Sequence, residues 1–303
     1  MAVLSYARRA KAILAAAGLA PKKSWGQNFL MDDQVLADIV AASGAPKGGT
    51  VIELGAGMGA LTLALLEHGI NVIAIERDRD LIPLLHKLRD EGGASTLTVT
   101  PADAARLDYG QMAEQVGAPL HILGNLPYQL SGRILVSLAE GADVIADAVV
   151  LVQREVAQRL CAEPGTKAYG LLSVLVGRRY DAQMVRDVPP GAFLPPPKVQ
   201  SSVVRLRRHG QLPWADLAYE GPAEELEAAF VEVARAAFHT RRKTLQNALG
   251  LGLGAPKAAV AQALAEAGID GTLRAEVLDL QAFARLAAAA LRSDLLTVRA
   301  NKG

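Results

Sequence analysis

A five-residue run from Gly124 to Tyr128 contains the groups that can hold an exocyclic amine, and it follows a short apolar segment that predicts a buried strand. The Asn125 amide oxygen can accept one hydrogen bond. Pro127 has no N–H and a fixed φ, so it keeps the preceding backbone extended and lets the Leu126 carbonyl accept a second bond. The Tyr128 ring offers a flat face for stacking. Two acceptors beside an aromatic ring suit the amino group of a nucleobase, although these residue types are also typical of a plain turn.

Glycines follow the first expected strand, at Gly55, Gly57 and Gly59. Glycines beside a helix N-terminus allow a tight turn and let the backbone approach a ligand closely. Glu76 lies 21 residues after Gly55, at the end of the second expected strand, which is the usual position of an acid that binds ribose hydroxyls. NAD and S-adenosylmethionine both carry such a ribose, so these residues leave both cofactors open.

A further carboxylate, Asp103, lies just after the third expected strand. It can accept a hydrogen bond from an adenine amine, or it can cap the helix that follows. The glycine loop, Glu76, Asp103 and Asn125 follow strands one to four in chain order. Open α/β sheets bind ligands at the carboxyl ends of their strands, so we expect these residues to form one site.

The coarse pattern predicts an α/β domain of Rossmann-like type, with a parallel sheet covered by helices on both faces, followed by a small helical domain. We expect the domains to be residues 1–209 and 210–303. The basic N-terminal segment predicts a helix ending at Gly18, and 189–197 predicts a loop. Strands are expected at 51–54, 71–75, 96–99, 120–123, 148–152 and 199–206. Helices are expected at 60–67, 81–89, 224–239, 241–249, 256–267 and 279–291.

Composition narrows the class of protein. The chain has 303 residues, 51% of them hydrophobic and 21% charged, which is typical of a globular protein. The net charge of +1 gives no global signal for nucleic acid, so a basic surface must come from clustering. Cys161 is the only cysteine, which excludes an intrachain disulfide and a Cys-based metal site. We expect no catalytic metal, no membrane association and a reduced, cytoplasmic setting.

Several motifs are spread over nearly the whole chain: 23–30, the glycine loop with Leu61-Thr62, 125–128, 153–155, 169–170, 193–199, 201–206, 241–249 and 274–276. Through these motifs the chain resembles the KsgA/RsmA family of small-subunit (16S) rRNA adenine N6-dimethyltransferases, which are class I methyltransferases. Trp25 departs from the family pattern, where another aromatic, often Phe, is usual. A sister family that methylates 23S rRNA usually lacks the segments at 193–199 and 241–243.

The resemblance implies transfer of methyl groups from S-adenosylmethionine to two adjacent adenosines in a hairpin loop near the 3′ end of 16S rRNA. The implied partner is an immature small ribosomal subunit, and we expect a monomer. The alternatives are a 23S rRNA or DNA adenine methyltransferase, a non-catalytic ribosome-assembly factor and an NAD oxidoreductase. The implied catalytic residues are Asn125, Leu126, Pro127 and Tyr128, and the implied cofactor pocket is Asn28, Leu30, Gly55, Gly57, Glu76, Asp103 and Asn125.

Basic residues cluster in three places that suit phosphate. Seven basic residues and two acids lie between 178 and 208, giving a local net charge of +5. Arg241, Arg242 and Lys243 are expected at a helix start, where cations oppose the helix dipole unless an anion compensates. A surface with local salt bridges explains such clusters equally well. The residues expected to contact RNA are Lys22, Lys23, Lys198, Arg241, Arg242 and Lys243.

Overall fold

The computed structural model describes residues 5–22, 25–91, 96–240, 242–293 and 295–296. It divides into two compact units: the first contains Met1–Cys161 and Tyr180–Arg208, and the second contains Ala162–Arg179 and His209–Gly303. A single boundary at 209 therefore does not describe the division, because 162–179 groups with the C-terminal residues.

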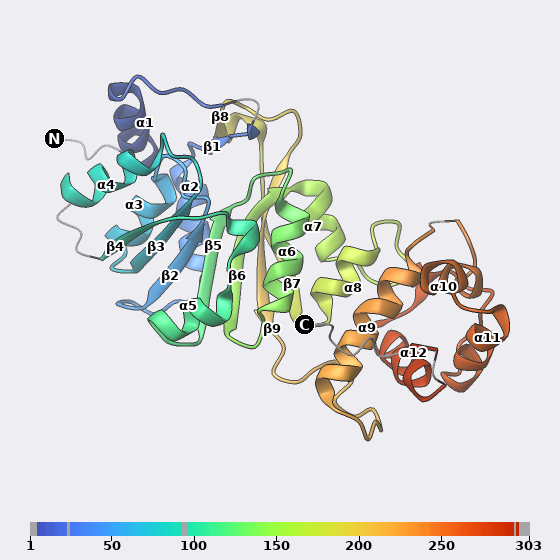
Figure 1. Ribbon diagram of the computed structural model, residues 1–303. Helices are drawn as coiled ribbons and strands as arrows, with labels where there is room; N and C mark the ends of the chain where they lie inside the picture. Colours follow the sequence, from blue (N-terminus) through green and yellow to red (C-terminus); the bar gives the residue numbers. More distant parts are fainter. Residues whose placement is uncertain (1–4, 23–24, 92–95, 241, 294, 297–303) are drawn as a thin grey trace. The chain divides into compact units, whose positions relative to one another are not determined.

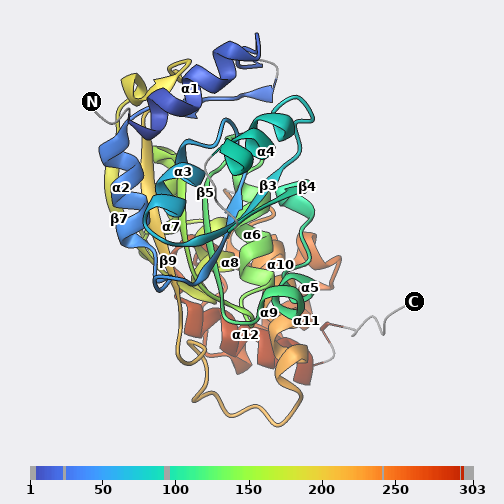
Figure 2. The ribbon, with the colours of Figure 1, turned by 90° about the vertical axis from the view of Figure 1, so that its left-hand side faces the viewer.

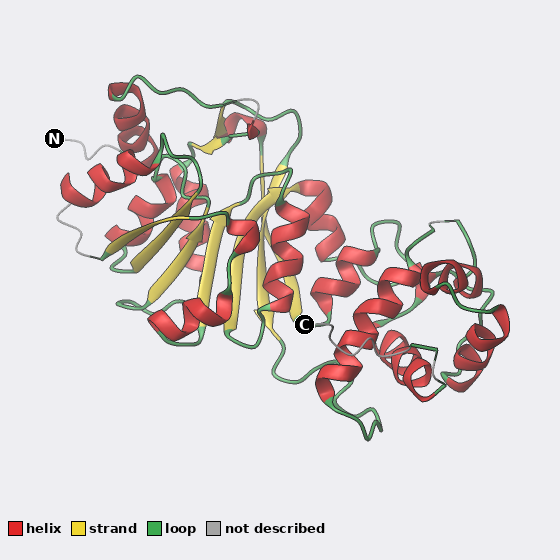
Figure 3. Ribbon diagram, in the orientation of Figure 1, coloured by secondary structure: helices red, strands yellow, loops and turns green. Residues whose placement is uncertain are grey.

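A seven-stranded sheet forms the centre of the first unit, with the strand order β4-β3-β2-β5-β6-β9-β7 (Figures 1 and 3). The first five strands in this order pair in parallel. Its central strands are apolar and almost continuously buried, as expected for strands that are covered on both faces. The strands are β2 (Thr50–Leu54), β3 (Asn71–Glu76), β4 (Leu97–Pro101), β5 (Leu120–Asn125), β6 (Ile145–Gln153), β7 (Tyr180–Val188) and β9 (Ser201–Arg208).

One strand departs from the expected parallel arrangement. β9 runs antiparallel to both of its neighbours, β6 and β7. Parallel neighbours need a long crossover, usually helical, whereas the connection from β7 to β9 contains only η3 (Pro190–Ala192) and β8 (Phe193–Leu194) and no α-helix. The pattern of the sequence located the strand at 199–206 but did not define its direction, and it missed β7.

Helices cover both faces of the sheet, which confirms the expected Rossmann-like architecture. Figures 1 and 2 show α2, α3 and α4 on one face and α5 and α6 on the other. The core on the α2–α4 face takes alternate residues of the strands, such as Val51, Val72 and Val149. The helices are α1 (Tyr6–Ala16), α2 (Asp33–Ala42), α3 (Ala60–Glu67), α4 (Ile82–Glu91), α5 (Tyr109–Val116), α6 (Ser131–Glu140) and α7 (Arg154–Leu160), with short 3-10 turns η2 (Ala104–Arg106) and η3 (Pro190–Ala192).

The N-terminal segment folds as the sequence indicated. α1 is followed by Gly18, which has the left-handed φ of 68° that favours glycine at a helix end. Further along, β1 (Phe29–Leu30) pairs antiparallel with β8 (Phe193–Leu194) as a separate two-stranded sheet. The segment expected to be a plain loop at 189–197 thus contains β8.

The second unit is helical and has an aromatic core. The Phe230 ring lies 4.6 Å from the Trp214 ring and 6.0 Å from the Phe283 ring, between centroids. Tyr169, from the segment before α8, donates a hydrogen bond to the Leu278 carbonyl at 2.8 Å, which links 162–179 to the C-terminal helices. The helices are α8 (Leu171–Gly177), α9 (Ala223–Ala237), α10 (Leu245–Leu253), α11 (Lys257–Glu266) and α12 (Leu280–Arg292), with a 3-10 turn η4 (Ala275–Val277).

One expectation about a helix changes with the structure. The helix expected from residue 241 begins at Leu245, with Thr244 as its N-cap, so Arg242 and Lys243 precede the helix instead of starting it. Arg241 lies outside the described residues. Throughout the part of the chain that the structure describes, no helix combines the length and the apolar character needed to cross a bilayer.

Gly124 at the end of β5 offers a test of how tightly the sheet is packed before Asn125. A Cβ atom added there would lie 2.6 Å from the Leu54 carbonyl oxygen of β2. We expect Gly124→Ala to lower stability by about 1–3 kcal/mol, because backbone and not a mobile side chain must move. Chemical unfolding measures this change. Gly132→Ala, with open space around the added atom, is the control, and equal stability of the two variants would contradict the argument.

Candidate functional site

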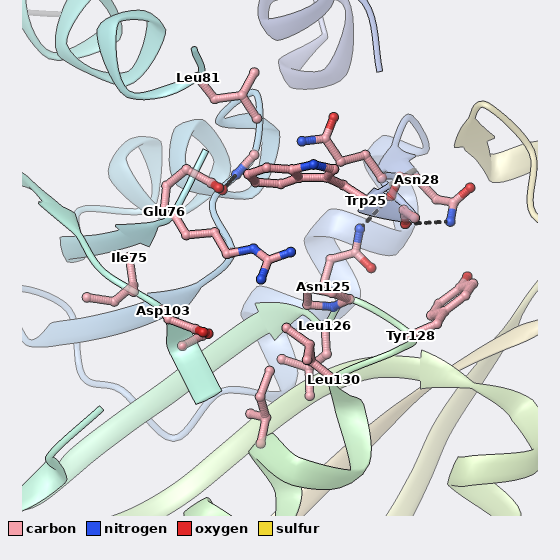
Figure 4. A pocket seen from close by; sticks show the side chains of 18 of the residues that line it. Trp25, Asn28, Ile75, Glu76, Leu81, Asp103, Asn125, Leu126, Tyr128 and Leu130 are labelled. Carbon is pink, nitrogen blue, oxygen red and sulfur yellow. Dashed lines mark hydrogen bonds between the residues drawn. The ribbon is translucent and has the colours of Figure 1, made fainter. Parts of the chain in front are cut away.

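A cleft lies at the carboxyl ends of β2, β3, β4 and β5, where the sequence motifs meet (Figure 4). It has a volume of about 720 Å³, including the solvent at its mouth. Figure 4 shows Glu76 and Asp103 on one side, Tyr128 on the other and Asn125 between them. Four of the chemistry-bearing positions named from the sequence therefore line one cavity.

The glycine loop and Glu76 are joined by a direct hydrogen bond. The backbone N–H of Gly57 donates to Glu76 Oε2 at 2.8 Å, and the N–H of Asp78 donates to Oε1 at 2.8 Å. Gly55 and Gly57 have left-handed φ angles of 72° and 59°, which favour glycine. These two backbone donors fix the carboxylate, and each oxygen retains a lone pair for a hydroxyl group.

Asp103 serves as a cap and still presents an oxygen to the cleft. Its Oδ1 accepts a hydrogen bond from the Ala105 backbone at 3.0 Å and so caps η2. Among the described residues, Oδ2 has no donor. The two roles considered from the sequence, helix cap and acceptor for a ligand amine, are therefore compatible in one side chain.

Asn125 is held by the N-terminal segment. Its Nδ2 donates to the Asn28 carbonyl at 2.8 Å, across 97 residues of sequence (Figure 4). The Asn28 side chain donates to the Gly26 carbonyl at 3.1 Å. No described residue donates to Asn125 Oδ1. The amide oxygen thus remains an available acceptor.

Tyr128 is anchored through its hydroxyl group. Its Oη lies 2.6 Å from Ser201 Oγ at the start of β9. Burial raises the pKa of Tyr128, an effect that the hydrogen bond with Ser201 partly offsets, so the phenol stays neutral near neutral pH. Leu126 is buried and lines the cleft together with Pro127. The ring of Tyr128 is therefore held in a defined position.

Residues 25–30, here called the strap, form one wall of the cleft. The strap is tied to the end of β3 through Gln27, which donates to Asp78 Oδ2 at 2.7 Å. Lys22, just before it, donates from Nζ to Asp78 Oδ1 at 2.6 Å and from its backbone N–H to Gln27 Oε1 at 2.8 Å. This arrangement gives Asn28 a fixed carbonyl with which to hold Asn125.

Leu30 does not line the cleft, unlike its expected partner Asn28. Its side chain is 4% exposed and belongs to the hydrophobic core. Neighbouring residues in a strand point to opposite faces, and in β1 it is Phe29 that faces the cleft and lies against Gly57. The Leu30 side chain thus packs in the core, and the assignment of Leu30 to the cofactor pocket stays a prediction.

Three further residues of the cleft region were not assigned a role from the sequence. The Trp25 ring lies across the cleft, with Arg77 Cζ 4.7 Å and Lys22 Nζ 5.0 Å from its centroid, both within cation–π range. Asp78 is a carboxylate only 1% exposed. Asp78 and Arg77 directly follow Glu76 in the sequence, which is the one signal that could have drawn attention to them.

Glu53 is a second buried carboxyl group beneath the cleft. It is 1% exposed and accepts a hydrogen bond from the Thr62 hydroxyl at 2.6 Å. Burial raises its pKa to about 8; the bond from Thr62 lowers the value and the negative charge of Glu76 raises it. Glu53 is therefore mostly neutral at pH 7 and packs as an acid with its proton in place.

The residues expected to contact RNA have different surroundings. Lys22 is paired with Asp78 at 2.6 Å and with Asp80 at 2.7 Å, and these bonds raise its pKa, so its charge is already compensated. Lys198 is exposed in the first unit, between β8 and β9. Arg242 and Lys243 are exposed in the second unit, and Lys23 and Arg241 lie outside the described residues.

Most arginines of the basic stretch 178–208 have local partners. Arg178 and Arg179 belong to the second unit and pair with Glu227. Arg186 pairs with Asp38 of α2. Arg205 lies 3.7 Å from Asp147, and Arg208 donates to backbone carbonyls, so local partners explain most of the excess charge. Lys198 remains as an exposed residue of this stretch that forms no ion pair with any described residue.

Comparisons with known proteins give one family. Residues 18–289 match the sequence profile of the family described as ribosomal RNA adenine dimethylase. The chain is 43% identical over 284 residues to a protein of Magnetococcus marinus named ribosomal RNA small subunit methyltransferase A, covering 94% of this chain and 97% of that one.

Solved structures share the fold. A dimethyladenosine transferase from Plasmodium falciparum superposes with a TM-score of 0.70 and 23% identity, covering 88% of this chain and 98% of that one. The 23S rRNA methyltransferase ErmE superposes with a TM-score of 0.63 and 24% identity, covering 86% and 99%. At these identities the likeness concerns architecture.

The raised pKa of Glu53 predicts a pH dependence of stability. In the unfolded chain this carboxyl titrates near its ordinary value of 4.5, and in the folded protein near 8. Its contribution to stability is therefore complete below pH 4.5 and decreases as the pH rises to 8, by a few kcal/mol at most. We expect Glu53→Gln to lose less stability than the wild type between pH 5 and pH 8.5, as measured by chemical unfolding. Glu140→Gln, at an exposed position, is the control and should follow the wild type. An equal change of the unfolding free energy with pH in Glu53→Gln and in the wild type would contradict the prediction.

Proposed function

Because the chain belongs to the ribosomal RNA adenine dimethylase family, we propose that it transfers methyl groups from S-adenosylmethionine to adenine N6 in small-subunit rRNA. The observation that carries this proposal is the placement of Asn125 beside Glu76 and Asp103 in one cleft. A ribose acid, an adenine acceptor and an amine acceptor at one sheet edge suit transfer from a nucleoside cofactor to an amino group.

The residues of the cleft fit S-adenosylmethionine. Glu76 would bind the ribose hydroxyls, since both of its oxygens are already oriented by backbone N–H groups. Asp103 Oδ2 would accept a hydrogen bond from the adenine amine. Gly55 and Gly57 have no side chains, so the backbone there can approach the cofactor closely. The Asn28 backbone forms the wall of the pocket on the side of the strap. When bound, this cofactor supplies a methyl group activated by a sulfonium.

Asn125 and Leu126 prepare the target amine. The N6 lone pair of adenine is delocalised into the ring and is a weak nucleophile. Asn125 Oδ1 and the Leu126 carbonyl would each accept one of its hydrogens, which favours a tetrahedral nitrogen and directs the lone pair. Such positioning lowers a barrier by several kcal/mol, up to roughly 7–11 in favourable cases. The same two oxygens stabilise the positive charge that develops on the nitrogen.

Tyr128 and Pro127 hold the base. The Tyr128 ring, fixed through Ser201, would stack on an adenine turned out of its RNA, a contact worth about 1–3 kcal/mol per base. Pro127 fixes the backbone that carries the Leu126 carbonyl. No proton needs to leave before transfer, so the residues do not have to include a strong base.

The substrate is assigned from the family and the relatives. The relative at 43% identity over 94% of this chain is named for the small subunit, whereas the resemblance to the 23S enzyme concerns the fold. The target would be two adjacent adenosines in a hairpin loop near the 3′ end of 16S rRNA. We also propose that the protein acts as a monomer in the cytoplasm, on the immature subunit. Hydride transfer by an NAD enzyme would not require the acceptor pair formed by Asn125 Oδ1 and the Leu126 carbonyl.

The decisive experiment uses labelled S-adenosylmethionine, immature small subunits and analysis of the digested RNA. We expect N6,N6-dimethyladenosine from the wild type. Asn125→Ala should lower kcat by roughly 10²–10³-fold, because one preorganised acceptor is lost. Label on another base would contradict the proposed function. Full activity of Asn125→Ala would contradict the mechanism but not the substrate.

The exposed basic residues provide a second prediction. We propose that Lys198, Arg242 and Lys243 contact phosphate, because they lie in the basic clusters of the sequence and are also exposed without an ion pair to any described residue. Replacing each by Ala should weaken RNA binding and reduce the slope of log K against log salt by about 1. Binding titrations at several salt concentrations measure this slope. Lys257→Ala, at another exposed lysine of the second unit, is the control, and equal slopes in all variants would contradict the assignment.

A further inference from the structure

Glu76 and Asn125 are connected through Asp78 and the strap, residues 25–30. The Asp78 N–H donates to Glu76, Gln27 donates to the Asp78 carboxylate, and Asn125 donates to the carbonyl of Asn28, the residue that follows Gln27 in the chain. Figure 4 shows the last of these bonds. We propose that the strap fixes the polarity of the Asn125 amide, and that Asp78 is the positioning residue that holds the strap. This inference rests on the proposed role of Asn125 as an acceptor. It adds a function for Asp78 and Gln27, neither of which contributes an atom to the acceptor pair.

The polarity of the amide follows from the chemistry of its partner. A carbonyl oxygen only accepts hydrogen bonds, so the atom of Asn125 that faces the Asn28 carbonyl at 2.8 Å must be Nδ2. Oδ1 is then directed away from the strap as an acceptor. An amide turned by 180° would set two oxygens against each other and would present N–H groups to an amine that itself needs acceptors. The Asn28 carbonyl therefore selects the productive orientation.

Asp78 is placed to hold the strap. It is 1% exposed, and its carboxylate accepts hydrogen bonds from Lys22 Nζ at 2.6 Å, from Gln27 Nε2 at 2.7 Å and from the Asp80 backbone at 3.1 Å. Its own N–H donates to Glu76. Burial raises the pKa of Asp78, but these donors outweigh burial and leave the pKa below its ordinary value. A buried, ionised and fully bonded carboxylate is a rigid anchor for the residues attached to it.

Fixed polarity matters most for the second methyl transfer. After one methyl group is added, the amine has a single hydrogen, and one of its two acceptors loses its partner. The remaining hydrogen bond must then orient the nitrogen without help. A strap that allows the Asn125 amide to turn should therefore impair the second transfer more than the first.

Substitutions at the contact between the strap and Asp78 test this. Asp78→Asn places an amide donor against the Gln27 donor, and Gln27→Glu places a carboxylate against Asp78. The double variant exchanges donor and acceptor and restores a matched pair. Asp80→Asn is the control, because Asp80 also pairs with Lys22 and carries the same charge but contacts neither Gln27 nor Glu76 in the structure.

We expect each single variant to lower kcat by roughly 10–100-fold, the size expected when a reacting group is slightly misplaced. The dissociation constant for S-adenosylmethionine should change by a smaller factor than kcat, because Glu76 keeps its backbone donors even though the strap also lines the cofactor pocket. The ratio of monomethyladenosine to dimethyladenosine should rise in the single variants and fall again in the double variant. The ratio is compared at equal total methyl incorporation, where it does not depend on the fraction of folded protein.

A spectroscopic measurement tests the inference without any substrate. The chain has five asparagines, so selective ¹⁵N-asparagine labelling gives five side-chain amide signals, and the loss of one in Asn125→Ala assigns that residue. We expect the Asn125 signal to shift or broaden in Asp78→Asn and Gln27→Glu, to return in the double variant and to stay unchanged in Asp80→Asn.

The outcomes separate the two proposals. An unperturbed Asn125 signal in both single variants, or an unchanged product ratio in active single variants, overturns the role of Asp78. Equal effects of Asp80→Asn and Asp78→Asn also overturn it, because they indicate a general charge effect. A wild type that binds S-adenosylmethionine but leaves adenine unmethylated contradicts the proposed function, while the Asn125 signal still decides whether Asp78 holds the strap.

Discussion

Parallel pairing of neighbouring strands is the constraint on which the site depends. When β2, β3, β4 and β5 run side by side in one direction, the residues that follow them must meet at one edge of the sheet. The glycine loop, Glu76, Asp103 and Asn125 are separated by many residues of sequence but line a single cleft for this reason. Backbone pairing, not direct attraction between these side chains, brings them together.

Hydrogen bonds then orient the side chains that the sheet brings together. Ionised carboxylates and carbonyls only accept, so each hydrogen bond to one of these groups in the cleft has one permitted direction. Backbone N–H groups orient Glu76, and the Asn28 carbonyl orients Asn125. The strap belongs to the site because its Asn28 carbonyl is the acceptor that orients the Asn125 amide. Preorganisation of this kind costs no rearrangement when the amine arrives.

Most of the clustered basic residues interact with local partners, which a count of charges along the chain does not show. Most basic residues between 178 and 208 are satisfied by carboxylates or backbone carbonyls nearby, and Lys22 serves to hold the strap. A count of basic residues along the chain cannot distinguish these from exposed ones such as Lys198. Nucleic-acid contacts are better sought among cations without local partners, because compensated charges add little attraction for phosphate.

The sequence by itself determined the α/β class, the positions of most strands and the residues at their ends, because apolar runs and turn residues are local signals. It also indicated the chemistry of Asn125 to Tyr128 from residue types alone. Only the tertiary structure decided the direction of β9, the burial of Leu30, the grouping of 162–179 with the C-terminal helices and the role of Asp78. Each of these depends on contacts between distant segments, and a hydrogen bond such as that from Asn125 to Asn28, across 97 residues, leaves no pattern in the sequence.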